Sequence, residues 1–106
     1  MNLIIGSHVS YNNKSQLLGS VKEALSYKAN TFMFYTGAPQ NTNRSVIEDS
    51  LTMEAYKIMK ENNIALEKVI VHAPYIVNLA NFNNFDFSVS FLINEVERCS
   101  TLGIKY

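Results

Sequence analysis

The sequence is poor in the residues that mark several classes of protein. Among its 106 residues there is one cysteine, Cys99, so no disulfide can form within the chain and we expect a reducing compartment, the cytoplasm by default. Nine basic and nine acidic residues give no net charge. That balance removes the composition-level argument for nucleic-acid binding through a broad basic face, so we expect any contact with nucleic acid to be local. There is no basic segment followed by a long apolar stretch, and no run approaches the roughly 18 apolar residues of a membrane span, so we expect no membrane partner.

The apolar content is sufficient for a folded core, since 47% of the residues are hydrophobic. Three short apolar or aromatic runs predict buried strands at Leu3–Gly6, Thr31–Tyr35 and Val69–Val71. The residues Ile104–Tyr106 resemble the opening of a fourth strand.

Between these runs the apolar residues recur three or four positions apart, which predicts three amphipathic helices. Ser15 is the expected N-cap of the first, Asn62 and Asn63 end the second, and Gly103 ends the third. Their apolar positions are Leu17, Leu18, Val21, Ala24 and Leu25, then Leu51, Ala55, Ile58 and Met59, and finally Val89, Leu92, Ile93, Val96, Cys99 and Leu102.

The alternation of strand and helix predicts an α/β fold with a parallel sheet and right-handed crossovers. A small doubly wound domain would fit the order, but the glycine-rich turn of a nucleotide site is missing. The other candidate is part of a (β/α)8 TIM barrel, which needs about 250 residues when complete. We therefore expect residues 1–106 to be a single partial domain, about three βα units and the start of a fourth strand.

In parallel α/β proteins functional groups gather after the carboxyl ends of the strands, which share one rim. The segments that follow the predicted strands are residues 7–8, 35–43 and 72–78, and they contain both histidines of the chain, His8 and His72. Each histidine is either a hydrogen-bonded structural group or a metal ligand. Zinc accepts imidazole nitrogen, but a site needs about three or four protein ligands, which this chain does not obviously supply.

For most of the other polar residues we expect structural roles. Tyr75 either packs beneath the rim or stacks on a ligand, and Asn78 is expected to stabilise its own loop. Cys99 lies on a predicted apolar helix face and is expected to be a small core residue. Solvated surface charge is expected for the acidic residues on or beside the helices, namely Glu48, Asp49, Glu54, Glu61, Glu95 and Glu97.

Three motifs resemble the endonuclease IV family of DNA-repair enzymes. The stretch His72–Ala80 is similar to the family signature His-x-x-Tyr, two apolar residues, Asn, an apolar residue and a small one. Gly6–Ser10 resembles the opening Gly-[Ala/Ser]-His-Val-Ser, and Tyr35–Asn41 resembles the loop after the second strand. The likeness runs from Asn2 to Tyr106.

This resemblance implies a TIM-barrel enzyme that hydrolyses the phosphodiester on the 5′ side of an abasic site in duplex DNA, leaving a 3′-hydroxyl and a 5′-deoxyribose phosphate. The family site uses three zinc ions, which activate water and neutralise charge on the phosphate. Loops of the family enter the minor groove and the base stack. Carried over by position, the resemblance makes His72 a zinc ligand, Tyr75, Gln40 and Asn41 DNA contacts, and His8 and Asn78 supporting residues around the metal centre.

The remaining ligands of the family come from later strands, so the catalytic residues themselves stay unknown and we expect the 106-residue chain to be inactive alone. One alternative is a metal-dependent sugar isomerase or epimerase on a related barrel. Another is a non-catalytic fragment that assembles with a missing half or with itself, since open strand edges favour pairing.

Overall fold

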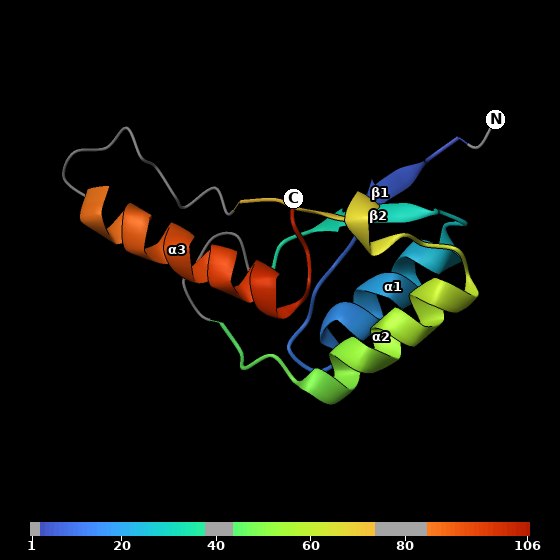
Figure 1. Cartoon of the computed structure of the whole chain (residues 1–106), viewed down its shortest axis with the longest axis horizontal. Coiled ribbons are helices and arrows are strands. Elements are labelled where there is room, and N and C mark those ends of the chain that lie inside the picture. Colours follow the sequence, from blue (N-terminus) through green and yellow to red (C-terminus); the bar gives the residue numbers. More distant parts are fainter. Residues whose placement is uncertain (1–2, 38–43, 74–84) are drawn as a thin grey trace.

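The structure is a computed structural model that describes residues 3–37, 44–73 and 85–106. Strands and helices alternate along it (Figure 1). The elements are β1 (Gly6–His8), α1 (Gln16–Ser26), β2 (Thr31–Phe34), α2 (Asp49–Glu61), a 3-10 turn (Leu66–Lys68), β3 (Ile70–Val71) and α3 (Phe85–Thr101).

The three strands form one parallel sheet in the order β1-β2-β3. Figure 1 shows α1 and α2 side by side beneath the sheet, with α3 set apart from them. The predicted α/β architecture with a parallel sheet is therefore confirmed. None of the helices in the described ranges has the length and apolar character that crossing a membrane requires.

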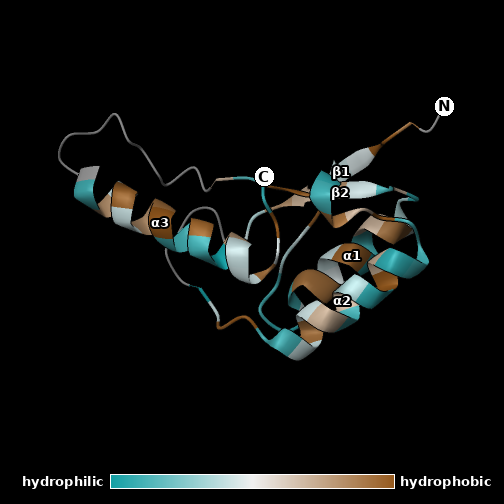
Figure 2. Ribbon diagram, in the orientation of Figure 1, coloured by the Kyte–Doolittle hydropathy of each residue, from teal (hydrophilic) through white to brown (hydrophobic). Residues whose placement is uncertain are grey.

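The core fills the space between β2 and the two packed helices. Phe32 and Phe34 are 2% and 0% exposed, and they alternate along β2 so that both point to the same face of the sheet. Apolar residues of α1 and α2 close over these rings, and the helices carry polar residues on their outer sides (Figure 2). The helical members of the core include Leu17, Leu18, Val21 and Ala24 from α1 and Ala55 and Met59 from α2.

The first strand was predicted at Leu3–Gly6 and buried, and this prediction was wrong. The strand begins at Gly6, and the side chains of Leu3 and Ile5 are 65% and 58% exposed. The cause lies across the sheet, where β2 begins only at Thr31. Before that point Asn30 supplies the partners: its side-chain amide accepts from the Ile5 backbone N–H at 2.7 Å and donates to the Leu3 carbonyl at 2.8 Å, and its backbone N–H donates to the Ile5 carbonyl at 3.0 Å.

Helix α1 begins at the predicted position, but its capping group differs from the prediction. Ser15 is the N-cap residue by position, yet its side chain makes no capping hydrogen bond. The Asn12 side chain instead accepts from the backbone N–H groups of Lys14 and Ser15, at 2.9 and 2.8 Å. A short Asx turn therefore leads into the helix.

The predicted ends of the second and third helices are confirmed. Asn62 is the C-cap of α2, and Asn63 follows with a φ of 59°, a left-handed conformation that asparagine tolerates. Gly103 follows α3 with a φ of 77°, and the next N–H, that of Ile104, donates to the Cys99 carbonyl at 2.9 Å. Glycine is required at position 103 because a Cβ there would also lie 2.5 Å from the Tyr56 hydroxyl oxygen.

Replacing Gly103 by alanine is expected to lower the free energy of unfolding by about 1–2 kcal/mol, because alanine resists the left-handed conformation. Displacement of Tyr56, whose hydroxyl donates to the Leu102 carbonyl, adds to that loss. Urea denaturation measures the effect. Ser100→Ala, at an exposed position of α3, is the matched control and should change stability by less than about 0.5 kcal/mol.

Helix α3 buries a different face from the one predicted. Ile93 and Val96, expected to face the core, are 54% and 61% exposed. Figure 2 shows hydrophobic segments along the visible side of α3, away from the other helices. The buried face of α3 instead carries Ser88, Phe91, Glu95 and Arg98, while Leu102, which was predicted to be buried, is buried just after the helix.

The predicted opening of a fourth strand is represented by one backbone hydrogen bond to β3. Residues Ile104–Tyr106 are not assigned as a strand. However, the Val71 N–H on β3 donates to the Tyr106 carbonyl at 2.7 Å. The chain therefore returns to the free edge of β3, as a fourth parallel strand would.

Candidate functional site

The sheet register brings three ring side chains to one face at the carboxyl ends of the strands. His8 pairs with Met33, which pairs with Ile70, so these three share a row. Two residues further along their strands, Tyr35 and His72 point to the same face because side chains alternate along a strand. This face is opposite to the one covered by α1 and α2.

The three rings are in contact. The centroid of His8 lies 4.9 Å from that of Tyr35 and 6.2 Å from that of His72, and Tyr35 and His72 are 4.9 Å apart. Both histidines are solvent-exposed, and Tyr35 is half-buried between them. The prediction that the two histidines share one rim is confirmed, and Tyr35, from the predicted rim segment 35–43, contacts both of them.

The position of the His72 ring favours one tautomer. Its Nδ1 lies 2.6 Å from the Ala73 carbonyl oxygen. A carbonyl only accepts, so this contact is a hydrogen bond in the tautomer that carries the proton on Nδ1, which leaves the lone pair of the neutral ring on Nε2. Metal-binding histidines commonly use this arrangement, in which a backbone carbonyl holds one nitrogen and the other is left to coordinate.

The described residues do not complete a metal site. Within them no three His, Cys, Asp or Glu side chains lie close enough to share an ion. Four of the residues singled out from the sequence lie outside the described ranges, so their predicted roles remain predictions. They are Gln40, Asn41, Tyr75 and Asn78.

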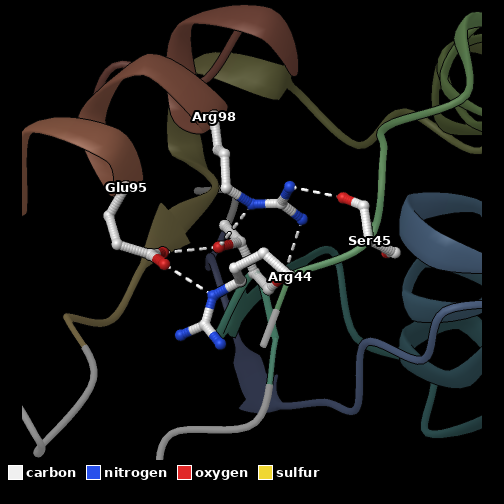
Figure 3. Close-up of polar contacts among 5 residues, drawn as sticks. Arg44, Ser45, Glu95 and Arg98 are labelled. Carbon is white, nitrogen blue, oxygen red and sulfur yellow. Dashed lines mark hydrogen bonds and ion pairs between the residues drawn. The ribbon is translucent and has the colours of Figure 1, made fainter. Parts of the chain in front are cut away.

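Directly behind the rim lies a buried polar cluster, drawn in Figure 3. Glu95 of α3 was predicted to be a solvated surface charge, and this prediction was wrong: the residue is 3% exposed. One oxygen of its carboxylate accepts from the Thr36 hydroxyl at 2.5 Å, and the other accepts from Arg44 Nε at 2.6 Å. A carboxylate so buried must be paired with a cation, which Arg44 supplies.

Arg98, one helical turn further along α3, completes the cluster. Its guanidinium donates to the carbonyl oxygens of Thr36 at 2.8 Å and Ser45 at 2.6 Å, and Nε donates to the Thr36 hydroxyl at 3.2 Å. Arg98 thus bridges the backbone on both sides of the connection between β2 and α2. We call Thr36, Arg44, Ser45, Glu95 and Arg98 the clamp.

The clamp was not found from the sequence, although a signal existed. One helical face is defined by residues spaced three or four apart, as regularly as the apolar residues are: Ser88, Phe91, Glu95 and Arg98. Charged residues are rarely buried, so the sequence pattern favours the apolar face of the same helix.

Cys99 was predicted to be a core residue, and it is half-buried beside the clamp. Burial raises the pKa of its thiol, the nearby Glu95 carboxylate raises it further, and Arg98 opposes them. A raised pKa keeps the sulfur protonated, so Cys99 is not an activated nucleophile.

Tyr11 stacks on Phe34 next to the clamp, and burial raises its pKa while the Arg98 guanidinium opposes the shift. A phenol whose pKa is higher in the folded state than in the unfolded state contributes to stability while it stays protonated. The contribution is complete below the unfolded pKa of about 10, and it is lost as the pH rises through the folded pKa. We expect the free energy of unfolding to fall above about pH 10, and to fall less steeply in Tyr11→Phe. Urea denaturation at pH 8 to 11 tests this, and equal slopes in both proteins would contradict it.

Comparisons with known proteins agree with the motifs. No family model matches the chain. The chain is 49% identical over 109 residues to a protein named probable endonuclease 4 from Mesoplasma florum, and 53% identical over 107 residues to the probable endonuclease 4 of Bacillus subtilis. These alignments cover 96% and 97% of the chain but only 37% and 35% of the relatives. The chain thus spans about a third of their length.

A solved structure has the same fold. The crystal structure of endonuclease IV from Thermus thermophilus superposes with a TM-score of 0.79 at 25% sequence identity. The match covers 95% of this chain and 37% of that one. The fold expected from the sequence, the N-terminal part of a TIM barrel, is therefore confirmed.

Proposed function

We propose, on the premise that this chain has the sequence and fold of the N-terminal portion of endonuclease IV proteins, that the whole protein incises duplex DNA on the 5′ side of abasic sites. The observation that carries the proposal is the convergence of His8, Tyr35 and His72 on the strand-end rim of a chain about half identical to proteins named endonuclease 4. We further propose a cytoplasmic location for this DNA-repair role.

In this proposal His72 is a zinc ligand through Nε2, because its Nδ1 proton is held by the Ala73 carbonyl. His8 supports the ligand from β1, which is separated from β3 by β2. The chemistry of these donors fits zinc, but they make an incomplete set, so the other ligands of the proposed three-zinc site come from elsewhere in the whole protein. The zinc ions would activate water and neutralise charge on the phosphate.

The DNA-contacting residues proposed for this chain are Gln40 and Asn41 after β2 and Tyr75 after β3, with Asn78 as a further supporting residue. A chain without net charge suits this mode of recognition, since insertion of side chains into the groove does not depend on a broad basic face.

The test is cleavage of a duplex that carries one synthetic abasic site, by the whole protein and by the 106-residue chain, each with and without added zinc. An undamaged duplex of the same sequence is the control. We expect the whole protein with zinc to nick the abasic strand alone, and the short chain to be inactive. Failure of the whole protein would sink the family function, and efficient incision by the short chain would overturn its proposed incompleteness.

We also expect the isolated chain to self-associate or to pair with the missing part of the barrel. Large apolar side chains are exposed on the described surface, including Ile4, Ile70, Ile93 and Val96. The outer strand β1, at the end of the sheet order, adds an open backbone edge. Sedimentation velocity tests this expectation, and a compact monomer up to about 100 μM would contradict it.

A further inference from the structure

The clamp joins three segments that are far apart in sequence. Thr36 follows β2, and Arg44 and Ser45 precede α2. Glu95 and Arg98 belong to α3, which comes after β3 in the sequence. The side chains of Arg44 and Glu95 are 5% and 4% exposed, and Arg98 is 9% exposed. Such burial of three charges is expensive, so their hydrogen bonds must be geometrically well formed for the fold to keep them.

The contacts fall on the two ends of the connection between β2 and α2. The single side chain of Arg98 donates hydrogen bonds to the backbone at both ends, to the carbonyls of Thr36 and Ser45. Glu95 also joins the two ends, but through their side chains: its carboxylate accepts from the Thr36 hydroxyl at one end and from Arg44 at the other. Two residues on consecutive turns of one helix therefore fix the separation of these ends.

Two neighbours hold Arg44 in place. A Cβ at Gly37 would lie 2.6 Å from Arg44 Cδ, so the absence of a side chain there gives Arg44 its path to Glu95. The Arg44 guanidinium also lies over the Phe91 ring, 4.9 Å from its centroid, a cation–π contact from the same face of α3.

We propose that Glu95 and Arg98 are positioning residues, which act through the clamp to hold Thr36 and Ser45, the two ends of the connection between β2 and α2, at the separation that binding of the damaged duplex requires. The inference rests on the proposed function, because that connection contains Gln40 and Asn41. The clamp also lies behind the rim, since Thr36 is adjacent to Tyr35. Neither Glu95 nor Arg98 touches substrate in this proposal.

Paired variants of the whole protein separate positioning from general stability. Thr36→Val keeps the shape of the side chain but removes the hydroxyl that joins Glu95 to Arg98, whereas Thr36→Ser keeps that hydroxyl. Glu95→Gln removes the buried charge, and Glu97→Gln makes the same change at an exposed position of the same helix. Even if Glu95→Gln fails to fold, the Thr36 pair tests the proposal.

We expect Thr36→Val and Glu95→Gln to raise the Kd for an abasic duplex about tenfold, with kcat changed by less than about threefold. Thr36→Ser should restore Kd to within about twofold of the unsubstituted protein, and Glu97→Gln should leave Kd and kcat unchanged. Zinc content should be the same in all variants. Amide hydrogen exchange should increase in peptides covering residues 36–45 and not in those covering α1.

The outcomes are distinguishable. If the unsubstituted protein does not bind or incise abasic DNA, the proposed function fails and the positioning role fails with it. If that protein is active but Thr36→Val and Glu95→Gln bind DNA as Glu97→Gln does, only the positioning role is overturned. A fall in thermal stability with an unchanged Kd for the folded protein would overturn it too, because that result indicates a purely structural cluster.

Discussion

Replacement of His72 by alanine in the whole protein is expected to lower incision of abasic DNA about 100-fold or more and to reduce the bound zinc. The reason is the tautomer of the ring: the Ala73 carbonyl fixes the proton on Nδ1, so Nε2 presents its lone pair at the strand-end rim. Zinc analysis of the purified protein and initial rates on a single-site abasic duplex measure the two effects.

His8→Ala is the matched comparison, because the two histidine rings lie only 6.2 Å apart and both are exposed. A supporting residue should lower activity about 10-fold and leave the zinc stoichiometry intact. If His72→Ala kept its full complement of zinc, the assignment of His72 as a ligand would be refuted.

Replacement of Phe34 by alanine is expected to have the largest effect on stability, lowering the free energy of unfolding by about 3–5 kcal/mol. The ring is fully buried at the centre of the sheet and packs against both Phe32 and Tyr11. A domain of this size has only about 5–15 kcal/mol of stability in total, so a large share of the variant should be unfolded under mild denaturant. Urea denaturation followed by circular dichroism gives the value.

Phe87→Ala is the control for this change, since the same side chain on α3 is 46% exposed. Its loss should cost less than about 1 kcal/mol. A cost for Phe34→Ala no greater than that of Phe87→Ala would contradict the placement of the core.

The ends of α2 and α3 were predictable from the sequence, because they depend on local chemistry. Gly103 ends α3 through a left-handed backbone that other residues resist, and Asn63 follows α2 in the same region of conformation. The periodicity of α1 and α2 also identified their buried faces correctly. These features are decided by residues within a turn of one another.

The features that sequence did not predict depend on distant partners. The strand predicted from Leu3 begins only at Gly6, because the side chain of Asn30, about 25 residues away, takes the hydrogen bond of the Ile5 N–H. Glu95 and Arg98 are buried because Thr36 and Ser45 lie opposite them. Periodicity within α3 carries no information about which other segment will face it.

The location of the candidate site could be predicted from the sequence, but the contacts among its residues could not. The rule that strand-end loops share a rim correctly grouped His8 with His72. The same rule placed Tyr35 on the rim, but its contact with both histidines depends on the parallel register, including the pairing of Phe34 with Val71. The ligand role of His72 stays a prediction until zinc is measured.

The clamp also constrains how this protein can change over evolutionary time. Glu95 is shared between Thr36 and Arg44, so a single mutation at either Glu95 or Arg44 leaves a buried charge of one sign without its counterpart. Homologous proteins should therefore either retain both residues or have substitutions at both positions. In an alignment of homologues, positions 44 and 95 should vary as a correlated pair, although they lie 51 positions apart in the sequence.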